Sequence, residues 1–223
     1  MEPTIIYQDK RILVTRKPPG VLSTDEPGGM PSLLRELLRE PQGCVRTVHR
    51  LDQVVGGLMV FARSAAASRA LSGQIRDHTF QKAYYAVIHG VPAKPEGTFQ
   101  DLLWRDRKTR RTRVAEEPGK DVHEASLDYQ LLESGAELSL VEIILHTGRT
   151  HQIRVQFSHR GLPLAGDRKY GIDDGYAMAL WSCHLGFFHP ETEKWMEFHD
   201  DPPFLAPWDS FTWKGRNRTG PFP

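Results

Sequence analysis

Hydrophobic and polar positions along the 223-residue chain change over short intervals, which predicts a mixture of strands and helices. Several segments have the β-branched, aromatic or alternating pattern of strands and are bounded by turn residues. These predicted strands lie at 4–15 (two short strands around a turn), 54–63, 82–90, 125–134, 137–148 and 179–190. The pair Ser134-Gly135 joins two of them, and residues 17–24 are rich in turn formers.

Three segments have helical periodicity or helix-end signals. Pro31 opens an amphipathic helix over 31–40, and Ser64 is suited to cap a second helix over 65–77. The third runs over 150–161, with Thr150 as its cap and Gly161 as its stop. Strands and helices mixed in this way predict an α+β fold with a largely antiparallel sheet. Without repeats or a linker, residues 1–213 should form a single domain, followed by a frayed tail at 214–223.

Composition narrows the class of protein only in part. Apolar residues make up 39% and charged residues 26% of the chain, which is typical of a folded soluble protein. The net charge of +1, from 29 basic and 28 acidic residues, neither demands nor excludes a polyanionic partner. Two cysteines suit a reducing compartment. No signal peptide or membrane span is evident, so we expect a cytoplasmic protein, and a monomer by default.

The first candidate for chemistry is Asp52, at the end of the cluster His49-Arg50-Leu51-Asp52 and next to a predicted buried strand. An aspartate there is commonly a turn or cap residue. A nearby arginine would keep a partly buried carboxylate ionised by lowering its pKa. Such a group could act as nucleophile, metal ligand or structural ion-pair partner.

The second candidate is the turn Thr147-Gly148-Arg149-Thr150 before the third helix. Free backbone amides beside Arg149 and His151 would form an anion site. In a regular helix Arg149 and Arg154 point about 140° apart, so one could face a phosphate and the other a buried acid. A capped helix with solvated arginines explains the same pattern.

A third candidate is the basic run 105–113, in which six of nine residues are Arg or Lys. It includes Arg107, Lys108, Arg110 and Arg111. Such a run can be a solvated loop, but it also has the charge density of a surface that binds a phosphate backbone. We find no zinc spacing around Cys183 and no phosphate-binding glycine loop, so neither a metal nor a nucleotide cofactor is indicated.

Three ordered motifs of the chain, with flanking segments, resemble those of the RluA-type pseudouridine synthases. They are HRLD at 49–52, KAYYAVIHG at 82–90, and GRTHQIRV followed by GLPLAGDRKYG at 148–171. The resemblance runs from KPPG at 17–20 to HPET at 189–192. It implies the pseudouridine synthase fold, a mixed sheet with flanking helices and a central RNA-binding cleft. It also implies isomerisation of uridines in RNA without cofactor or metal: the uracil is detached, turned and rejoined through carbon 5.

Carried over by motif, the resemblance implies Asp52 as the catalytic carboxylate acting on a flipped-out uridine. Tyr84 would pack on the base and is a candidate for proton transfer, and Arg154 would pair with the aspartate. Arg50 would hold the RNA open, and Leu180 would line the pocket. We expect the RNA, ribosomal or transfer RNA, to contact further residues as well: His49, Arg149, Thr150, His151, Arg107, Lys108, Arg110 and Arg111.

The chain also departs from the family pattern. Val55-Gly56-Gly57 stands where the family usually has Thr-Ser-Gly, and Leu180-Trp181-Ser182 stands where it often has Leu-His-Ala. We also expect no N-terminal RNA-binding domain of the kind that some members carry. Two other functions stay open from the sequence: a non-catalytic RNA-binding protein on the same scaffold, and a hydrolase of N-glycosidic bonds.

Overall fold

In a computed structural model, which describes residues 2–212, the strands form one mixed sheet. The strand order is β1-β2-β4-β10-β5-β9-β8-β6-β7, with β11 beside β10 and β3 beside β4. Every pairing is antiparallel except that of β4 with β10. The strands are β1 Thr4–Gln8, β2 Ile12–Lys17, β3 Arg46–Thr47, β4 Gly56–Ala62, β5 Gln81–His89, β6 Glu96–Asp106, β7 Arg111–Ala115, β8 Val122–Ser134, β9 Leu138–Leu145, β10 Leu180–Phe188 and β11 Trp195–His199.

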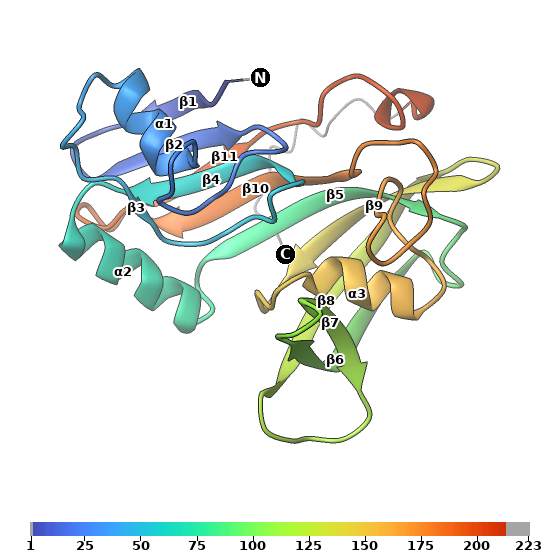
Figure 1. The fold of residues 1–223 in the computed structure, drawn as a ribbon. Helices are drawn as coiled ribbons and strands as arrows, with labels where there is room; N and C mark the ends of the chain where they lie inside the picture. The colour runs from blue at the N-terminus through green and yellow to red at the C-terminus, as the bar shows by residue number, and fades with distance from the viewer. Residues whose placement is uncertain (1, 213–223) are drawn as a thin grey trace.

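Three α-helices flank this sheet: α1 Met30–Leu37, α2 Ala65–Arg76 and α3 Gln152–His159. Helices α1 and α2 lie in the half of the molecule built on β1, β2, β4 and β10, and α3 lies in the half built on β6 to β9 (Figure 1). A short 3-10 helix follows at Trp208–Ser210. The predicted α+β class with a largely antiparallel sheet is confirmed.

Apolar side chains on the two faces of β4 explain how the helices attach. Met59 and Phe61 face a core shared with Leu34 of α1 and Phe157 of α3. Val60 faces the opposite core together with residues of α2. Helices α1 and α3 therefore cover one face of the sheet, and β5 and β10 run between them.

Of the two predicted helix N-caps, Ser64 and Thr150, the structure has one. The Ser64 hydroxyl accepts a hydrogen bond from the Ala67 amide at 3.1 Å, so the predicted cap of α2 is confirmed. The predicted Thr150 cap is wrong, because the N-cap of α3 is His151, whose backbone is left-handed (φ 56°) and whose side chain makes no capping bond. The Thr150 hydroxyl instead accepts a hydrogen bond from Arg105 at 3.2 Å.

Several strands differ from their predicted form. The buried strand begins at Gly56 rather than at 54, because the Val55 amide closes a turn onto the Asp52 carbonyl at 3.0 Å. The basic run 105–113 is not a loop but the end of β6, a turn and most of β7, and we call it the basic hairpin. Strands β3, β6, β7 and β11 were not predicted. The predicted tail 214–223 lies outside the described residues.

The unusual glycine pair has a steric explanation in β10. A Cβ on Gly56 would lie 2.3 Å from the Trp181 ring, and one on Gly57, where φ is +111°, would lie 2.3 Å from the Ser182 carbonyl oxygen. Trp181 packs with Tyr85 on the sheet face opposite to Tyr84 and Leu180. The glycines at 56 and 57 and the tryptophan at 181, which both differ from the family pattern, therefore fit each other on the sheet face opposite to Tyr84.

None of the helices within residues 2–212 combines the length and apolar character that a bilayer-spanning helix needs. The extent of the domain, 1–213, stays a prediction.

Candidate active site

A chain of three charged side chains forms the centre of the site. Arg154 donates to the Asp52 carboxylate through Nη1 at 2.9 Å. Its Nε and Nη2 donate to the two oxygens of Asp167, both at 2.7 Å. Asp167 is fully buried and the Arg154 side chain is 6% exposed, whereas that of Asp52 is 24% exposed. Of these three charged side chains, Asp52 is thus the one whose carboxylate solvent or substrate can reach.

In this series of three side chains, one arginine lies between two carboxylates, Asp52 and Asp167. Burial opposes the charge of Arg154, but its hydrogen bonds to Asp167 and Asp52 raise its pKa above the ordinary arginine value. Asp167 also accepts from the backbone amides of Lys169 and Tyr170, at 3.0 and 3.1 Å. Asp167 therefore holds Arg154 through Nε and Nη2, and the remaining Nη1 donates to Asp52.

The loop that carries Asp52 is held by contacts with an earlier part of the chain. The Ser23 hydroxyl accepts from the Leu51 amide at 3.0 Å and donates to the Leu51 carbonyl at 2.8 Å. Lys17, fully buried, donates to the carbonyls of Gln53 at 3.1 Å and Val21 at 2.6 Å. Burial lowers the Lys17 pKa to about 8, against the opposing pull of the Asp52 charge. These contacts hold the loop that places the Asp52 carboxylate just before β4.

The floor of the site is formed by β5 and β10. Tyr84 and Leu180, each 5% exposed, line the cleft beside Asp52. Burial and the Asp52 charge raise the pKa of the Tyr84 hydroxyl well above its ordinary value. Tyr84 is therefore neutral at physiological pH, and it lines the cleft beside Asp52.

His151 also lines the cleft. Its Nε2 is 3.8 Å from the Asp52 carboxylate, and its Nδ1 is 2.7 Å from the Tyr170 hydroxyl. The Thr112 amide donates to that hydroxyl at 2.8 Å, which leaves the hydroxyl proton for Nδ1. Burial lowers the pKa of His151 to about 4, so the ring is neutral at pH 7 and turns Nε2–H toward Asp52.

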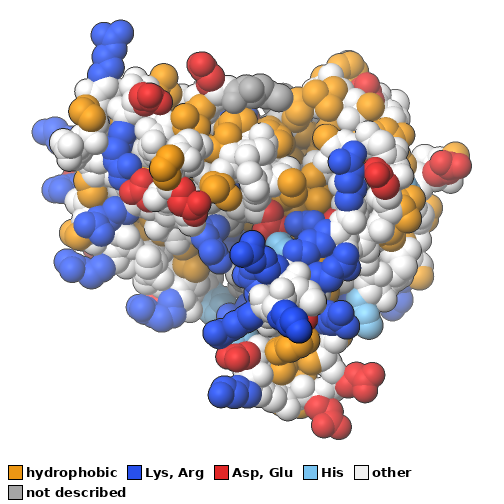
Figure 2. Space-filling view, in the orientation of Figure 1, with side chains coloured by type: hydrophobic (Ala, Val, Ile, Leu, Met, Phe, Trp, Pro, Cys, Tyr) orange, Lys and Arg blue, Asp and Glu red, His pale blue; other side chains and the backbone are white. Residues whose placement is uncertain are grey.

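The cleft around these residues has a volume of about 820 Å³ and is strongly cationic. Of the described residues that line it, only Asp52 carries a carboxylate, whereas six carry Arg or Lys side chains: Arg50, Arg76, Lys82, Arg105, Arg149 and Arg154. Figure 2 shows Lys and Arg side chains gathered around a hollow in which acidic and histidine side chains are visible. This charge pattern suits a polyanion whose reacting part meets one carboxylate.

A second hollow of about 560 Å³ continues the cleft along the basic hairpin. The two hollows share Arg105, Gly148, Arg149 and Thr150. The hairpin is tied to the segments before and after α3 by hydrogen bonds from Lys169 Nζ to the Arg110 carbonyl and from the Thr112 hydroxyl to the Thr150 carbonyl, at 2.5 and 2.9 Å. The cations of the hairpin are therefore held at one end of the cleft.

The residues predicted to bind RNA take different places around these hollows. Arg50, Arg149, Thr150, His49 and His151 line the cleft. The His49 ring also accepts from the Val60 amide at 3.1 Å, and burial lowers its pKa to about 3. On the basic hairpin, Arg107 and Arg110 line the second hollow. Lys108 and Arg111 are exposed nearby, with the Arg111 guanidinium 5.8 Å from the Tyr170 ring centre.

Sequence reasoning missed four residues that shape the site: Lys17, Lys82, Tyr170 and Asp167. All lie within segments that the family resemblance covers, KPPG, KAYYAVIHG and GLPLAGDRKYG. A lysine beside two prolines or an aspartate after a glycine looks like an ordinary turn residue. Within residues 2–212, no group of three or more His, Cys, Asp or Glu side chains is arranged to hold a metal ion.

Comparison with known proteins agrees with this geometry. A sequence model described as RNA pseudouridylate synthase matches residues 11–159. Over 210 residues the chain is 36% identical to YlyB of Bacillus subtilis (strain 168), described as an uncharacterized RNA pseudouridine synthase, covering 89% of this chain and 68% of that protein. It is 32% identical to the dual-specificity RNA pseudouridine synthase RluA of Vibrio vulnificus (strain CMCP6), covering 84% of this chain and 78% of that protein.

Solved structures show the same fold. Human RNA pseudouridylate synthase domain containing 1 superposes with a TM-score of 0.79 at 25% identity, covering 94% of this chain and 87% of that one. Human RNA pseudouridylate synthase domain containing 4 gives a TM-score of 0.75 at 22% identity, covering 90% and 88%. The predicted pseudouridine synthase fold is confirmed. The chain belongs to the RluA-type family of RNA pseudouridine synthases, isomerases that act on uridine in RNA.

Proposed function

We propose that this protein isomerises specific uridines in structured ribosomal or transfer RNA, with Asp52 as the catalytic carboxylate. The observation that carries the proposal is the arrangement of charge in the cleft. Asp52 is the carboxylate that the described lining residues present, among six cationic side chains, and its partner Arg154 is anchored by a second acid, Asp167. An RNA backbone is attracted to such a cleft, while one reactive anion meets the nucleotide.

The residue types fit the steps of the reaction. The N1–C1′ bond of uridine must break, a C5–C1′ bond must form, and a proton must leave C5 while N1 gains one. Asp52, kept charged by Arg154, is suited to act as base or nucleophile. Tyr84 offers a face for the uracil ring to stack on, which offsets part of the cost of removing the base from its stack.

Arg50 is proposed to occupy the space that the flipped nucleotide leaves. It is exposed, lines the cleft beside Asp52, and its guanidinium has no hydrogen-bond partner within residues 2–212. We further propose that residues 1–213 act as one domain, as a monomer in the cytoplasm, without metal or cofactor.

The test is to map pseudouridines in cellular RNA from a deletion strain against its parent. Sites that disappear on deletion and return with the wild-type gene identify the substrate as ribosomal or transfer RNA. Complementation with Asp52→Asn should leave those sites as uridine. If the deletion changes no site in either RNA class, the proposed substrates are wrong. If Asp52→Asn restores the sites, the protein acts without this carboxylate, as a non-catalytic RNA-binding protein would.

A further inference from the structure

We propose that Lys82 binds a backbone phosphate of the target uridine nucleotide. This inference rests on the proposed function, because it concerns the same cleft, and it adds a contact that the catalytic group does not supply.

Lys82 is a buried cation without a counter-ion. Its side chain belongs to a residue that is only 8% exposed, at the start of β5. Within residues 2–212 its ammonium makes no hydrogen bond and no ion pair, and the Nζ atom itself is reached by solvent at the cleft. The buried lysine of the opposite loop, Lys17, donates to backbone carbonyls instead. An ammonium without a protein partner at the wall of a cleft is available to bind an anion from outside.

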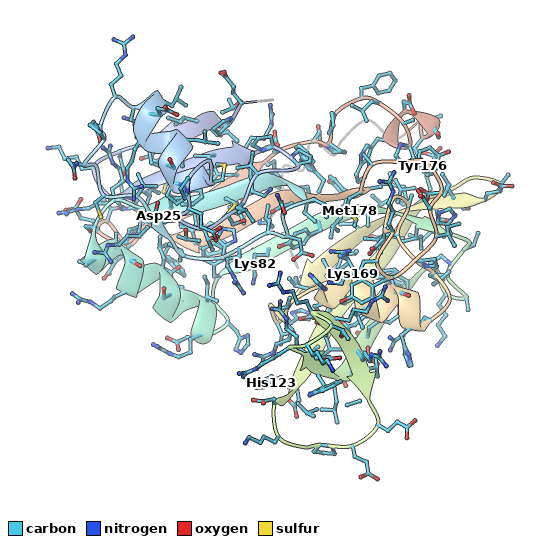
Figure 3. The ribbon with its side chains drawn as sticks, in the orientation of Figure 1. Asp25, Lys82, His123, Lys169, Tyr176 and Met178 are labelled. Atoms are coloured by element: carbon cyan, nitrogen blue, oxygen red, sulfur yellow. The ribbon has the colours of Figure 1, made fainter. Side chains whose placement is uncertain are left out.

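The Lys82 side chain points into the cleft. Lys82 and Tyr84 lie two positions apart on β5, so they share one sheet face, and both line the cleft. Figure 3 places Lys82 between the half of the molecule that carries α2 and the half that carries α3. A methyl group added to Gly148 would lie 3.3 Å from the Lys82 Nζ. The glycine therefore leaves the ammonium accessible at the turn before α3.

No acidic side chain within residues 2–212 pairs with Lys82. Burial lowers the pKa of its ammonium. Its charge, together with burial, keeps the nearby His49 ring neutral. Asp52, the one carboxylate among the described cleft-lining residues, is already bonded to Arg154.

The position of Lys82 on β5 favours a phosphate close to the flipped base. Lys82 and Tyr84 are about 6.6 Å apart along the strand and line the same cleft, so the lysine belongs to the part of the cleft where the uracil would stack. Asp52 lies beside the same ring and would face the ribose. Lys82 is therefore placed for a phosphate of the flipped nucleotide itself, whereas the basic hairpin is placed for phosphates farther along the RNA.

The test compares mononucleotides in binding titrations followed by the NMR signal of the Gly148 amide. The probes are uridine, 5′-UMP, 3′-UMP and inorganic phosphate, with wild-type protein, Lys82→Met and a control variant of an exposed lysine, Lys94→Met. One of the two UMP isomers should bind wild-type protein about tenfold more tightly than uridine, as expected for a charge-assisted hydrogen bond. Lys82→Met should reduce that ratio to near one, and Lys94→Met should keep it.

Several outcomes would overturn the inference. Equal binding of UMP and uridine by wild-type protein, or absence of any saturable response, would remove the phosphate contact. An unchanged preference in Lys82→Met would assign the contact to another residue. Inorganic phosphate binding as tightly as UMP would indicate a free-phosphate site rather than a contact to the target nucleotide.

The proposed function can fail separately from this inference. Pseudouridine formation by a wild-type protein that lacks the phosphate preference would refute only the role of Lys82. A Lys82-dependent preference in a protein that forms no pseudouridine would refute only the proposed function. Asp52→Asn should retain the preference, because Asp52 contacts neither the phosphate nor Lys82.

Discussion

Replacing Asp167 by Asn tests whether the ion-pair series Asp167–Arg154–Asp52 holds the proposed catalytic carboxylate in place. The variant keeps the size of the side chain but removes the negative charge behind Arg154. The carboxylate accepts from Arg154 Nε and Nη2 and from two backbone amides, and it is fully buried. An amide in its place directs an NH₂ group at a donor of one of these partners.

The expected loss is large because a buried cation loses one of its two acids. Removing one partner of a buried ion pair costs about 3–5 kcal/mol. Asn retains one acceptor oxygen, so we expect about 3 kcal/mol in the free energy of unfolding. Arg154 should then shift toward Asp52 and displace the carboxylate, and a displacement of about 1 Å can lower turnover about 100-fold.

Urea unfolding and pseudouridine formation by purified protein measure the two effects. Asp173→Asn is the matched control, because Asp173 forms an exposed ion pair with Arg168 at 2.9 Å and is 71% exposed. Such pairs contribute about 0–1 kcal/mol, so this variant should resemble wild type. If Asp167→Asn unfolds at the wild-type urea concentration and retains full turnover, Asp167 does not hold Arg154.

Three further predictions concern other parts of the molecule. The double variant Arg110→Ala, Arg111→Ala should weaken RNA binding and reduce the slope of log affinity against log salt by about 1.4, which is near 0.7 for each lost phosphate contact. An unchanged slope would mean that these two arginines contact water rather than RNA phosphates. Because the pKa of His151 is lowered to about 4, only the unfolded chain gains its proton as pH falls below about 6.5. The free energy of unfolding should then fall toward pH 4 by up to about 1.4 kcal/mol per pH unit, and His151→Gln should lose this contribution; equal pH profiles would contradict it. Gly56→Ala should lower stability by about 1–3 kcal/mol through its clash with Trp181, and Trp181→His should recover part of the loss; the absence of any recovery would show that the pair is not coupled.

The sequence predicted those parts of the fold that depend on local pattern. The Ser64 cap, the strand pair around Ser134-Gly135 and the buried strand ending near Ala62 follow from residue types a few positions apart. The basic hairpin was not predicted, because its charged sequence lacks the apolar alternation of a strand. Its two strands are held by pairing with each other and by the hydrogen bond from Thr112 to Thr150, which are contacts of the folded chain. The Thr150 cap failed for a related reason, since contacts with the hairpin draw that side chain away from the helix.

In the site, too, the sequence predicted what depends on local motifs and missed what depends on contacts in the folded chain. The motif resemblance singled out Asp52, Tyr84 and Arg154, and the structure brings them to one cleft. The bond between Asp52 and Arg154 joins residues 102 positions apart, which no local pattern reveals. Asp167 and Lys82 were missed because their importance lies in burial and in the presence or absence of a partner, and both are properties of the folded chain.

The most direct test of the central claim follows the hydrogen at carbon 5 of uridine. RNA labelled with tritium at this position, prepared from the deletion strain, is incubated with purified wild-type protein or with Asp52→Asn. Because the new C–C bond replaces the C5–H bond, wild-type protein should release tritium to water in proportion to the pseudouridine formed, and Asp52→Asn should bind the RNA but release none. Equal release by both proteins, or free uracil in place of pseudouridine, would contradict the assignment of Asp52 as the catalytic carboxylate of an isomerase.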